Sequence, residues 1–264
     1  MAAVTLACNV TGAQDFVGWR SYGGDNHNSH YSTLAGINRD NVARLEPAWS
    51  YASASGAELP ATSELQVNPI VVDGVLYGRN PLYNVFAIDA ASGAELWSYN
   101  PDIGHVGLSN MRGVTYWQDD SGRDRRILFS TGHFLMAVNA TSGKPIPGFG
   151  DNGRVDLRDG LGRDPEKISV NAPSPGVIFE DLIIMGSAVT ETAGAAPGDI
   201  RAYDVRSGKL AWTFHTIPHP GEFGYDTWPE GAFRTAGGAN AWAGMSVDVR
   251  RGVVYVPTGS PTPD

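Results

Sequence analysis

Cysteine is almost absent from this sequence. Cys8 is the single thiol among 264 residues. One thiol excludes an internal disulfide framework and a zinc cluster built from several thiolates, and it leaves the redox compartment open. The motif Cys-x-x-Cys-His does not occur either, so no c-type haem is attached covalently to this chain.

Long apolar runs and clusters of positive charge are also missing. No stretch of about 18 apolar residues occurs, so the sequence predicts no membrane-spanning helix. The net charge of -9 and the lack of a Lys/Arg run argue against a nucleic-acid partner. Residues 1–15 lack the charged start and long apolar stretch of a secretory signal, and we interpret them as a leader or disordered segment.

Glycine and proline, in contrast, are plentiful. The chain contains 33 Gly and 17 Pro, which is typical of many short strands joined by turns. With 42% hydrophobic residues, it is long enough to bury a sizeable core. One short helix is expected, over residues 38–45, with Asn38 as its cap.

A short motif, Ala-x-Asp/Asn-x-x-Ser-Gly, occurs three times, at residues 87–93, 137–143 and 202–208. The last residues of successive copies are 50 and 65 positions apart, which indicates a structural repeat with insertions. Two copies continue to a tryptophan four residues after the glycine, at Trp97 and Trp212. Three unrelated hairpins with shared turn chemistry are the less favoured alternative.

Each copy has the properties of a strand, a tight turn and a second strand. Asp89 can accept hydrogen bonds from backbone amides two or three residues on, which closes the turn. Gly93 supplies the positive φ that a residue with a Cβ reaches only at a cost. Trp97 then presents a large apolar face that its own hairpin cannot cover. The repeat therefore predicts hairpins that stack on one another.

The segments between the copies complete this unit. A hairpin at residues 69–77, with Asp-Gly at its turn, precedes the first copy. Each unit then contains four strands, and radial repetition of such units is a β-propeller. A fourth unit begins at residues 246–256. We expect an all-β chain in which residues 16–264 form a partial propeller, truncated within this fourth unit. Trp49 lies on a strand expected to complete the last blade of a closed ring.

The repeat cores resemble the tryptophan-docking motif of the pyrroloquinoline quinone (PQQ) dehydrogenases. Several connecting segments are similar to this family too, particularly to quinoprotein glucose dehydrogenase: residues 19–25, 66–77, 219–229, 237–240 and 257–261. The resemblance covers nearly the whole chain from about residue 16. It implies an eight-bladed propeller, of which this chain is roughly the first half, with PQQ on the central axis beside a Ca²⁺ (or Mg²⁺) ion.

The resemblance also implies the site residues. Arg112 matches an arginine that pairs with a PQQ carboxylate, a task that suits the planar fork of a guanidinium. Ser187 is placed to bond a PQQ carboxylate. Trp242 matches the tryptophan that forms the floor under the PQQ ring. Glu191 matches the carboxylate ligand of the metal, and Ser260 is a second, weaker metal contact, since hard cations prefer oxygen ligands.

The sequence departs from the family pattern at several positions. Met111 precedes Arg112, where the family often has Asn. Ala188 stands where the sugar-oxidising branch often has Arg, and Ser260 where alcohol-oxidising relatives have an Asn ligand. The adjacent cysteine pair of the alcohol-oxidising branch is replaced by Gly107-Leu108-Ser109, which favours the sugar or polyol branch.

The implied function is oxidation of a sugar or polyol hydroxyl to a carbonyl, with hydride transfer to PQQ. Electrons then pass to a membrane quinone or a cytochrome in the bacterial periplasm, from a free or membrane-associated enzyme. The general-base Asp of the family is expected beyond Asp264, so no catalytic residue is assigned here and the fragment alone is expected to be inactive. The alternatives are a PQQ-dependent alcohol dehydrogenase, a sugar-binding propeller lectin, and a non-catalytic propeller scaffold of the outer-membrane assembly type. Arg112, Glu191 and Trp242 together disfavour the scaffold, and a lectin would not need the Gly-Ser-x-x-x-Glu element at residues 186–191.

Overall fold

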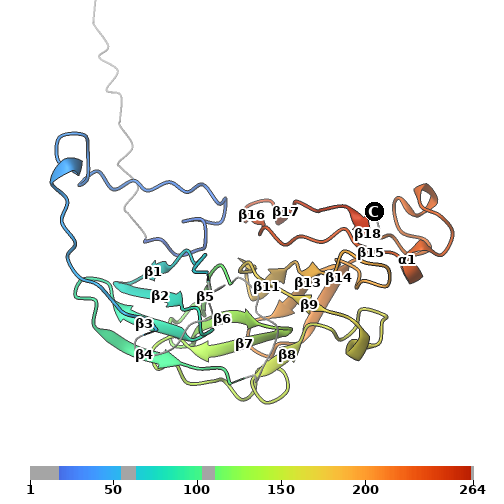
Figure 1. Cartoon of the computed structure of the whole chain (residues 1–264), viewed down its shortest axis with the longest axis horizontal. Coiled ribbons are helices and arrows are strands. Elements are labelled where there is room, and N and C mark those ends of the chain that lie inside the picture. Colours follow the sequence, from blue (N-terminus) through green and yellow to red (C-terminus); the bar gives the residue numbers. More distant parts are fainter. Residues whose placement is uncertain (1–17, 55–63, 103–110, 263–264) are drawn as a thin grey trace, which may run out of the picture.

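The computed structural model describes residues 18–54, 64–102 and 111–262 (Figure 1). The predicted leader, the single cysteine and the loop at residues 107–109 lie outside this part of the chain. Strands dominate the described residues, so the all-β prediction is confirmed. No helix among them is long and apolar enough to cross a membrane.

Three antiparallel sheets of four strands form the body of the molecule. In each sheet the strands lie in the order in which they occur in the sequence, although the third sheet omits β12 (Ala188–Val189). The first sheet contains β1 (Ile70–Val72), β2 (Val75–Arg79), β3 (Val85–Asp89) and β4 (Glu95–Tyr99). The second contains β5 (Thr115–Gln118), β6 (Arg125–Thr131), β7 (Phe134–Asn139) and β8 (Arg154–Asp156). The third contains β10 (Val177–Phe179), β11 (Leu182–Met185), β13 (Ile200–Asp204) and β14 (Leu210–Phe214).

Shorter elements connect and follow these sheets. β16 (Ser246–Asp248) and β17 (Val253–Tyr255) form the hairpin with which the predicted fourth unit begins. Two small ladders lie in the insertions. In one, β9 (Val170–Asn171) pairs with β12 (Ala188–Val189). In the other, β15 (Gly237–Gly238) pairs with β18 (Pro261–Thr262).

Helical structure is limited to single turns in the described residues. The helix expected over residues 38–45 is reduced to the 3-10 turn η1 (Val42–Arg44), which buries no residue. Two further 3-10 turns are η2 (Pro165–Lys167) and η3 (Tyr225–Thr227). The one α-helix, α1 (Ala232–Thr235), was not predicted, because its four residues give no periodic pattern.

The turn chemistry predicted for the repeat is confirmed. Asp89 Oδ1 accepts hydrogen bonds from the backbone amides of Ala91 and Ser92 and from the Ser92 hydroxyl. These bonds, above all the one from the Ser92 side chain, lower the pKa of Asp89. Gly93 has a φ of +75°. The second and third copies repeat the arrangement around Asn139 and Asp204.

The predicted docking of tryptophans between neighbouring units is also confirmed. Trp97 Nε1 donates to the carbonyl of Ala140 at 3.0 Å. Its ring lies so close to Gly143 that a Cβ there would be 2.5 Å from the indole. Trp49 docks in the same way on the first copy, with Nε1 3.2 Å from Ala90 O. Trp49 lies outside any strand, however, so only its docking and not its predicted strand is present.

The third copy has a different neighbour because the second copy carries no tryptophan. A Cβ on Gly208 would meet Val155 of β8 at 2.7 Å. Trp212 is 39% exposed, since no turn of a following unit covers it among the described residues.

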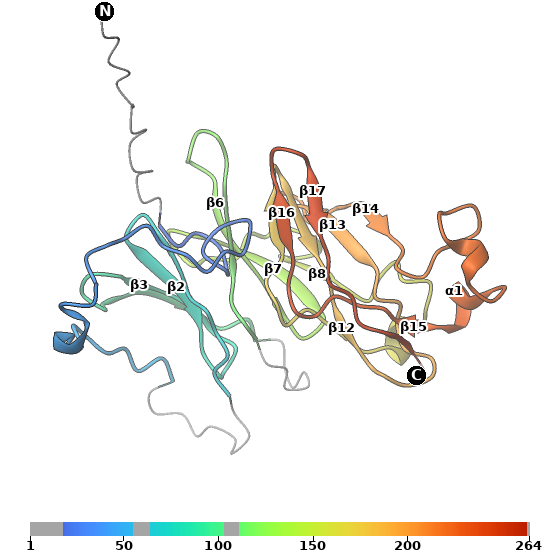
Figure 2. The same ribbon diagram turned by 90° about the horizontal axis from the view of Figure 1, so that it is seen from above.

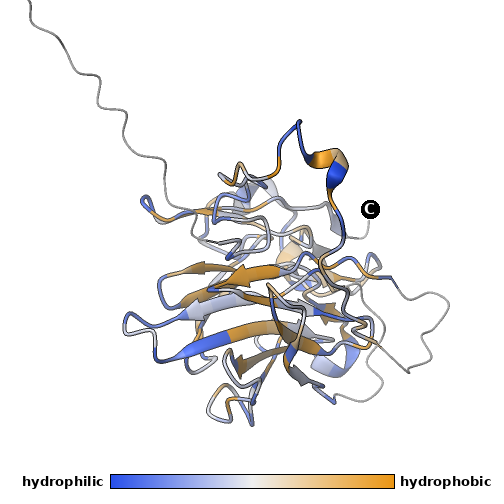
Figure 3. Cartoon of the chain, turned by 90° about the vertical axis from the view of Figure 1, so that its left-hand side faces the viewer, coloured by the Kyte–Doolittle hydropathy of each residue, from blue (hydrophilic) through white to orange (hydrophobic). Residues whose placement is uncertain are grey.

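The core lies between consecutive sheets, which are arranged side by side in sequence order (Figure 2). One buried cluster joins the first and second sheets through residues such as Ile70 and Ile127. A second joins the second and third sheets through Leu128 and Ile183. A third links the third sheet to the β16–β17 region through Ile184 and Met245. Figure 3 shows the same pattern, with apolar strands and more polar connections.

Candidate functional site

A cavity of about 440 Å³ lies among the insertions that connect the sheets. It is lined by Arg112, Asn171, Pro173, Ala188, Val189, Glu191, Asn240, Trp242, Gly259, Ser260 and Thr262. None of these residues belongs to a four-stranded sheet, and the two short ladders β9–β12 and β15–β18 form part of the wall. The rigid sheets therefore carry a cavity that is built from their connections.

Four of the five predicted site residues meet at this cavity. Arg112, Glu191, Trp242 and Ser260 all line it, although they are far apart in the sequence. Ser187 does not line it: this residue is 4% exposed and lies behind the wall. Its carbonyl accepts a hydrogen bond of 2.8 Å from the side-chain amide of Asn240, which does line the cavity.

Arg112 and Trp242 form the centre of the wall. The guanidinium carbon of Arg112 lies 5.2 Å from the centroid of the Trp242 ring, within range of a cation–π interaction. Ser174 joins the two residues, because its hydroxyl accepts from Arg112 Nη1 at 3.4 Å and donates to Trp242 O at 2.6 Å. Trp242 is 49% exposed, so much of its ring is open to a ligand.

The backbone holds Arg112 in place on both sides. Its amide donates to Pro173 O at 2.8 Å, and its carbonyl accepts from the Asn68 amide at 2.9 Å. Gly113 permits this close approach, since a Cβ there would lie 3.0 Å from Asn68 O. Met111, which departs from the family pattern, is 7% exposed and belongs to the core. The departure therefore leaves Arg112 on the cavity wall.

Charge is sparse in the cavity. Arg112 and Glu191 are the two charged side chains among the lining residues. Within the described part of the chain, no carboxylate lies within ion-pair distance of Arg112. A guanidinium beside an open indole and without a carboxylate suits a flat anionic ligand.

The oxygen atoms around Glu191 are mostly neutral. Asn171, Asn240, Ser260 and Thr262 contribute amide or hydroxyl groups to the wall. Thr262 Oγ1 is buried and has no hydrogen-bond partner among the described residues. No cluster of three or more His, Cys, Asp or Glu residues within the described ranges is arranged to hold a metal. This donor set fits part of a shell for a hard cation such as Ca²⁺, which binds six to eight oxygens.

Sequence reasoning missed several lining residues. Asn240 lies in residues 237–240, which resemble the family, so the sequence could have indicated it. Asn171, Pro173 and Thr262 offered none, because they occur in connections without a repeated pattern. The two small ladders place Asn171 and Thr262 in the wall, and the hydrogen bond from the Arg112 amide places Pro173 beside Arg112.

A larger cavity, of about 710 Å³, lies elsewhere. It is bounded by residues 18–33 and by parts of β5 and β10, and no predicted site residue lines it. Size alone would favour this cavity. We place the candidate site in the smaller one, because only there do a free guanidinium, an open indole and a carboxylate converge.

The comparisons with known proteins identify the family of the chain. Residues 19–264 match the family model described as PQQ: glucose/ethanol/alcohol dehydrogenase, beta-propeller domain. The chain is 32% identical to quinate/shikimate dehydrogenase (quinone) of Acinetobacter baylyi, over 97% of this chain and 34% of that protein. It is 31% identical to quinoprotein glucose dehydrogenase of Escherichia coli, over 93% of this chain and 32% of that protein.

A solved structure supports the fold. The quinohemoprotein alcohol dehydrogenase of Comamonas testosteroni matches with a TM-score of 0.73 and 26% identity, over 94% of this chain and 36% of that one. The predicted β-propeller architecture is thereby confirmed. The chain spans about a third of the length of the relatives that it matches. These matches, together with the repeats, show that the chain belongs to the PQQ-dependent glucose/ethanol/alcohol dehydrogenase family, within its β-propeller domain.

Proposed function

We propose that this chain provides a cofactor-binding wall of a PQQ- and Ca²⁺-dependent dehydrogenase that oxidises a sugar or polyol hydroxyl. The observation that carries the proposal is the convergence of Arg112, Trp242 and Glu191 in one cavity. A non-catalytic scaffold has no need of a guanidinium without a carboxylate beside a half-exposed indole.

Each wall residue has a distinct task in this proposal. Arg112 binds a carboxylate of PQQ through its planar donors. Trp242 offers its ring as a stacking surface for the flat cofactor. Ser187 contributes indirectly, because its carbonyl orients Asn240 while its own side chain stays behind the wall.

Glu191 is proposed as the anionic ligand of the cation, which is Ca²⁺ or Mg²⁺. Ser260 and the side-chain carbonyl of Asn240 add neutral oxygens from the opposite connections. When bound, PQQ supplies a two-electron acceptor for hydride, and the cation polarises its quinone. The general base is proposed to come from another part of the complete protein, because Glu191 is the only carboxylate on the described wall.

The substrate class rests on the relatives. Proteins named for glucose, glycerol and quinate or shikimate share 30 to 32% identity with this chain. A second candidate is an alcohol dehydrogenase, which the fold match to the Comamonas testosteroni enzyme favours. In either case we propose a bacterial periplasmic enzyme, free or membrane-associated, that passes electrons to a membrane quinone or a cytochrome.

The test uses the protein expressed from the complete gene that encodes this chain. The apoprotein is titrated with PQQ in the presence of Ca²⁺, and tryptophan fluorescence reports binding. Dye reduction is then measured with glucose, glycerol, quinate and ethanol. We expect saturable PQQ binding and turnover with a sugar or polyol. A folded apoprotein that binds no PQQ at any Ca²⁺ concentration would overturn the proposal, and preference for ethanol would support the second candidate.

A further inference from the structure

Residues 170–174, here called the strap, connect the different parts of the cavity wall. Asn171, at the start of the strap, pairs with Ala188 in the β9–β12 ladder. Pro173 O accepts from the Arg112 amide at 2.8 Å. Ser174 at its end bonds both the Arg112 guanidinium and Trp242 O. A shift of the strap would therefore move both Arg112 and Trp242.

The back of the strap is fixed by a residue outside the cavity. Ala172 is 1% exposed, and its carbonyl accepts a hydrogen bond from Ser130 Oγ. Ser130 lies near the end of β6 in the second sheet and is 6% exposed. Loss of the Ser130 hydroxyl would leave the buried Ala172 carbonyl without this hydrogen bond, because water cannot easily reach it.

Ser130 is held in turn by Arg79 of the first sheet. The Arg79 guanidinium donates to Ser130 O, to Thr131 Oγ1 at 2.7 Å and to Tyr83 O at 3.0 Å. Arg79 is 1% exposed and stacks over Phe129 at 5.2 Å. No carboxylate among the described residues forms an ion pair with it.

The chemistry of Arg79 makes this anchor strong. Burial lowers the pKa of Arg79 to about 9, so the side chain still carries its charge at neutral pH. A charged donor forms stronger hydrogen bonds than a neutral one, and here neutral oxygen atoms must satisfy the charge. The guanidinium Nε has no partner within the described part of the chain. The bonds of Arg79 to Ser130, Thr131 and Tyr83 are therefore costly to break.

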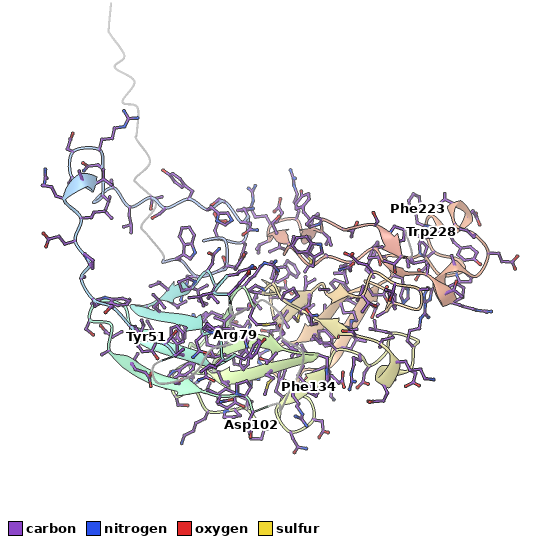
Figure 4. The ribbon with its side chains drawn as sticks, in the orientation of Figure 1. Tyr51, Arg79, Asp102, Phe134, Phe223 and Trp228 are labelled. Atoms are coloured by element: carbon purple, nitrogen blue, oxygen red, sulfur yellow. The ribbon has the colours of Figure 1, made fainter. Side chains whose placement is uncertain are left out.

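These contacts form one continuous path from the first sheet to the cavity wall (Figure 4 labels Arg79). We propose that Ser130 and Arg79 are positioning residues of the candidate cofactor site: they hold the strap so that Arg112 and Trp242 face the cavity together. Neither residue lines the cavity. The proposal rests on the proposed function for its link to PQQ, but its structural step can be tested without the cofactor.

Arg126 provides a comparison. It is also a buried arginine, 8% exposed, and it also donates from one sheet to backbone carbonyls of the next. Unlike Arg79, it forms an ion pair as well, with Asp124 at 2.8 Å. Its acceptors are Val205 O at 3.0 Å and Arg206 O at 2.7 Å. These lie in the turn of the third repeat copy, so Arg126 joins two sheets without contacting the strap. A purely structural role for Arg79 would give its variants the same consequences as variants of Arg126.

The first test measures hydrogen exchange in the apoprotein expressed from the complete gene. The variants are Ser130→Ala, Arg79→Lys and Arg126→Lys. We expect the amide of Arg112, which donates to the strap, to exchange at least tenfold faster in Ser130→Ala and Arg79→Lys. In Arg126→Lys it should exchange at the wild-type rate. Equal exchange at Arg112 in all three variants would overturn the proposal, whether or not the protein binds PQQ.

The second test measures the dissociation constant for PQQ with Ca²⁺ present. We expect about a tenfold increase for Ser130→Ala, which corresponds to about 1.4 kcal/mol. Ser130→Thr keeps the hydroxyl and should restore most of the affinity, while Arg126→Lys should leave it within about twofold. If Ser130→Ala does not fold, Arg79→Lys serves in its place. Unchanged affinity in a folded variant contradicts the positioning role, whereas failure of the wild type to bind PQQ contradicts the proposed function instead.

Discussion

Trp97 and Trp242 are the same residue type in two contrasting environments. Trp97 is 9% exposed, its Nε1 donates to Ala140 O, and its ring covers Gly143. Trp242 is 49% exposed, and its indole N–H has no hydrogen-bond partner among the described residues. One face of its ring is turned to a guanidinium instead of a glycine. Trp97 is therefore covered by contacts within the protein, whereas part of the Trp242 side chain remains accessible to a ligand.

The same contrast separates the repeated turns from the connections between them. Each repeat turn satisfies its own polar groups, as Asp89 does with the amides and hydroxyl that follow it. Among the described residues, the cavity wall instead leaves Thr262 Oγ1 without a hydrogen-bond partner and Arg112 without an ion pair. Unsatisfied groups are costly in a folded protein unless something else binds them. Repetition therefore marks the scaffold, whereas the candidate site lies in the connections between the repeats.

The largest effect is expected from removing a docked tryptophan. Trp97→Ala should lower the free energy of unfolding by about 4 kcal/mol, because a buried indole and its hydrogen bond are both lost. Trp212→Ala in the same chain should cost only about 1 kcal/mol, since Trp212 is 39% exposed. Urea unfolding followed by circular dichroism measures both values. Equal costs would show that docking between units contributes little.

The next effect is expected from filling the glycine under the docked ring. Gly143 has a φ of +68°, and a Cβ there would lie 2.5 Å from Trp97. Gly143→Ala should cost about 3 kcal/mol, from backbone strain and from displacement of the ring. Gly122→Ala is the control, because Gly122 has a φ of +65° but only a side-chain nitrogen at 3.5 Å. It should cost about 1 kcal/mol. The difference between the two variants isolates the contact with Trp97.

Substitution in the cavity should reverse the pattern, with a large effect on binding and a small one on stability. Arg112→Ala is expected to weaken PQQ binding by about 30-fold, or about 2 kcal/mol, through loss of charged hydrogen bonds. Its unfolding free energy should change by less than about 1 kcal/mol. Arg123→Ala, on the exposed β5–β6 turn, is the control and should change neither quantity. A loss of stability as large as that of Trp97→Ala would mean that Arg112 belongs to the scaffold.

The smallest effect concerns Asp199, a buried carboxylate outside the cavity. Asp199 is 6% exposed, and burial raises its pKa, against smaller opposing effects of His215 and a hydrogen bond from the Thr216 amide. The folded state therefore binds the Asp199 proton more tightly than the unfolded state does. The contribution of Asp199 to stability falls as the pH rises from the unfolded pKa of 3.8 through the folded one.

Asp199→Asn keeps the acceptor for Thr216 and removes the buried charge. The urea midpoint of Asp199→Asn, relative to that of the wild type, should therefore be higher at pH 7 than at pH 4. If the urea midpoint of the wild type instead increased relative to that of Asp199→Asn as the pH rises, the Asp199 charge would stabilise the fold.

The sequence was most informative where a physical constraint recurred. The turn residues, the docking of the tryptophan and the four-stranded unit could all be predicted, because each copy must close the same turn and bury the apolar surface that follows it. The predicted site residues depended on the family resemblance, and four of the five line one cavity. Ser187 illustrates the limit: its neighbours in sequence place it beside the site, but only the fold shows that its side chain is buried.

Other features could not be predicted for a definite reason. The strap joins Arg112, Trp242 and Ser130 through contacts between residues 40 or more positions apart, mostly with single backbone carbonyls. Every residue has a backbone carbonyl, so the sequence does not show which donor a given carbonyl accepts a hydrogen bond from. Arg79 likewise resembled an ordinary strand-end arginine, and only its burial shows that it anchors the next sheet.

The order of docking partners along the chain has a consequence for biosynthesis. The glycine of each repeat turn is covered by a residue that precedes it: Trp49 covers Gly93, Trp97 covers Gly143 and Val155 covers Gly208. The ribosome thus releases every covering side chain before the turn that receives it. Each new hairpin can dock on a surface that has already emerged, so these three units can assemble in the order in which they are translated.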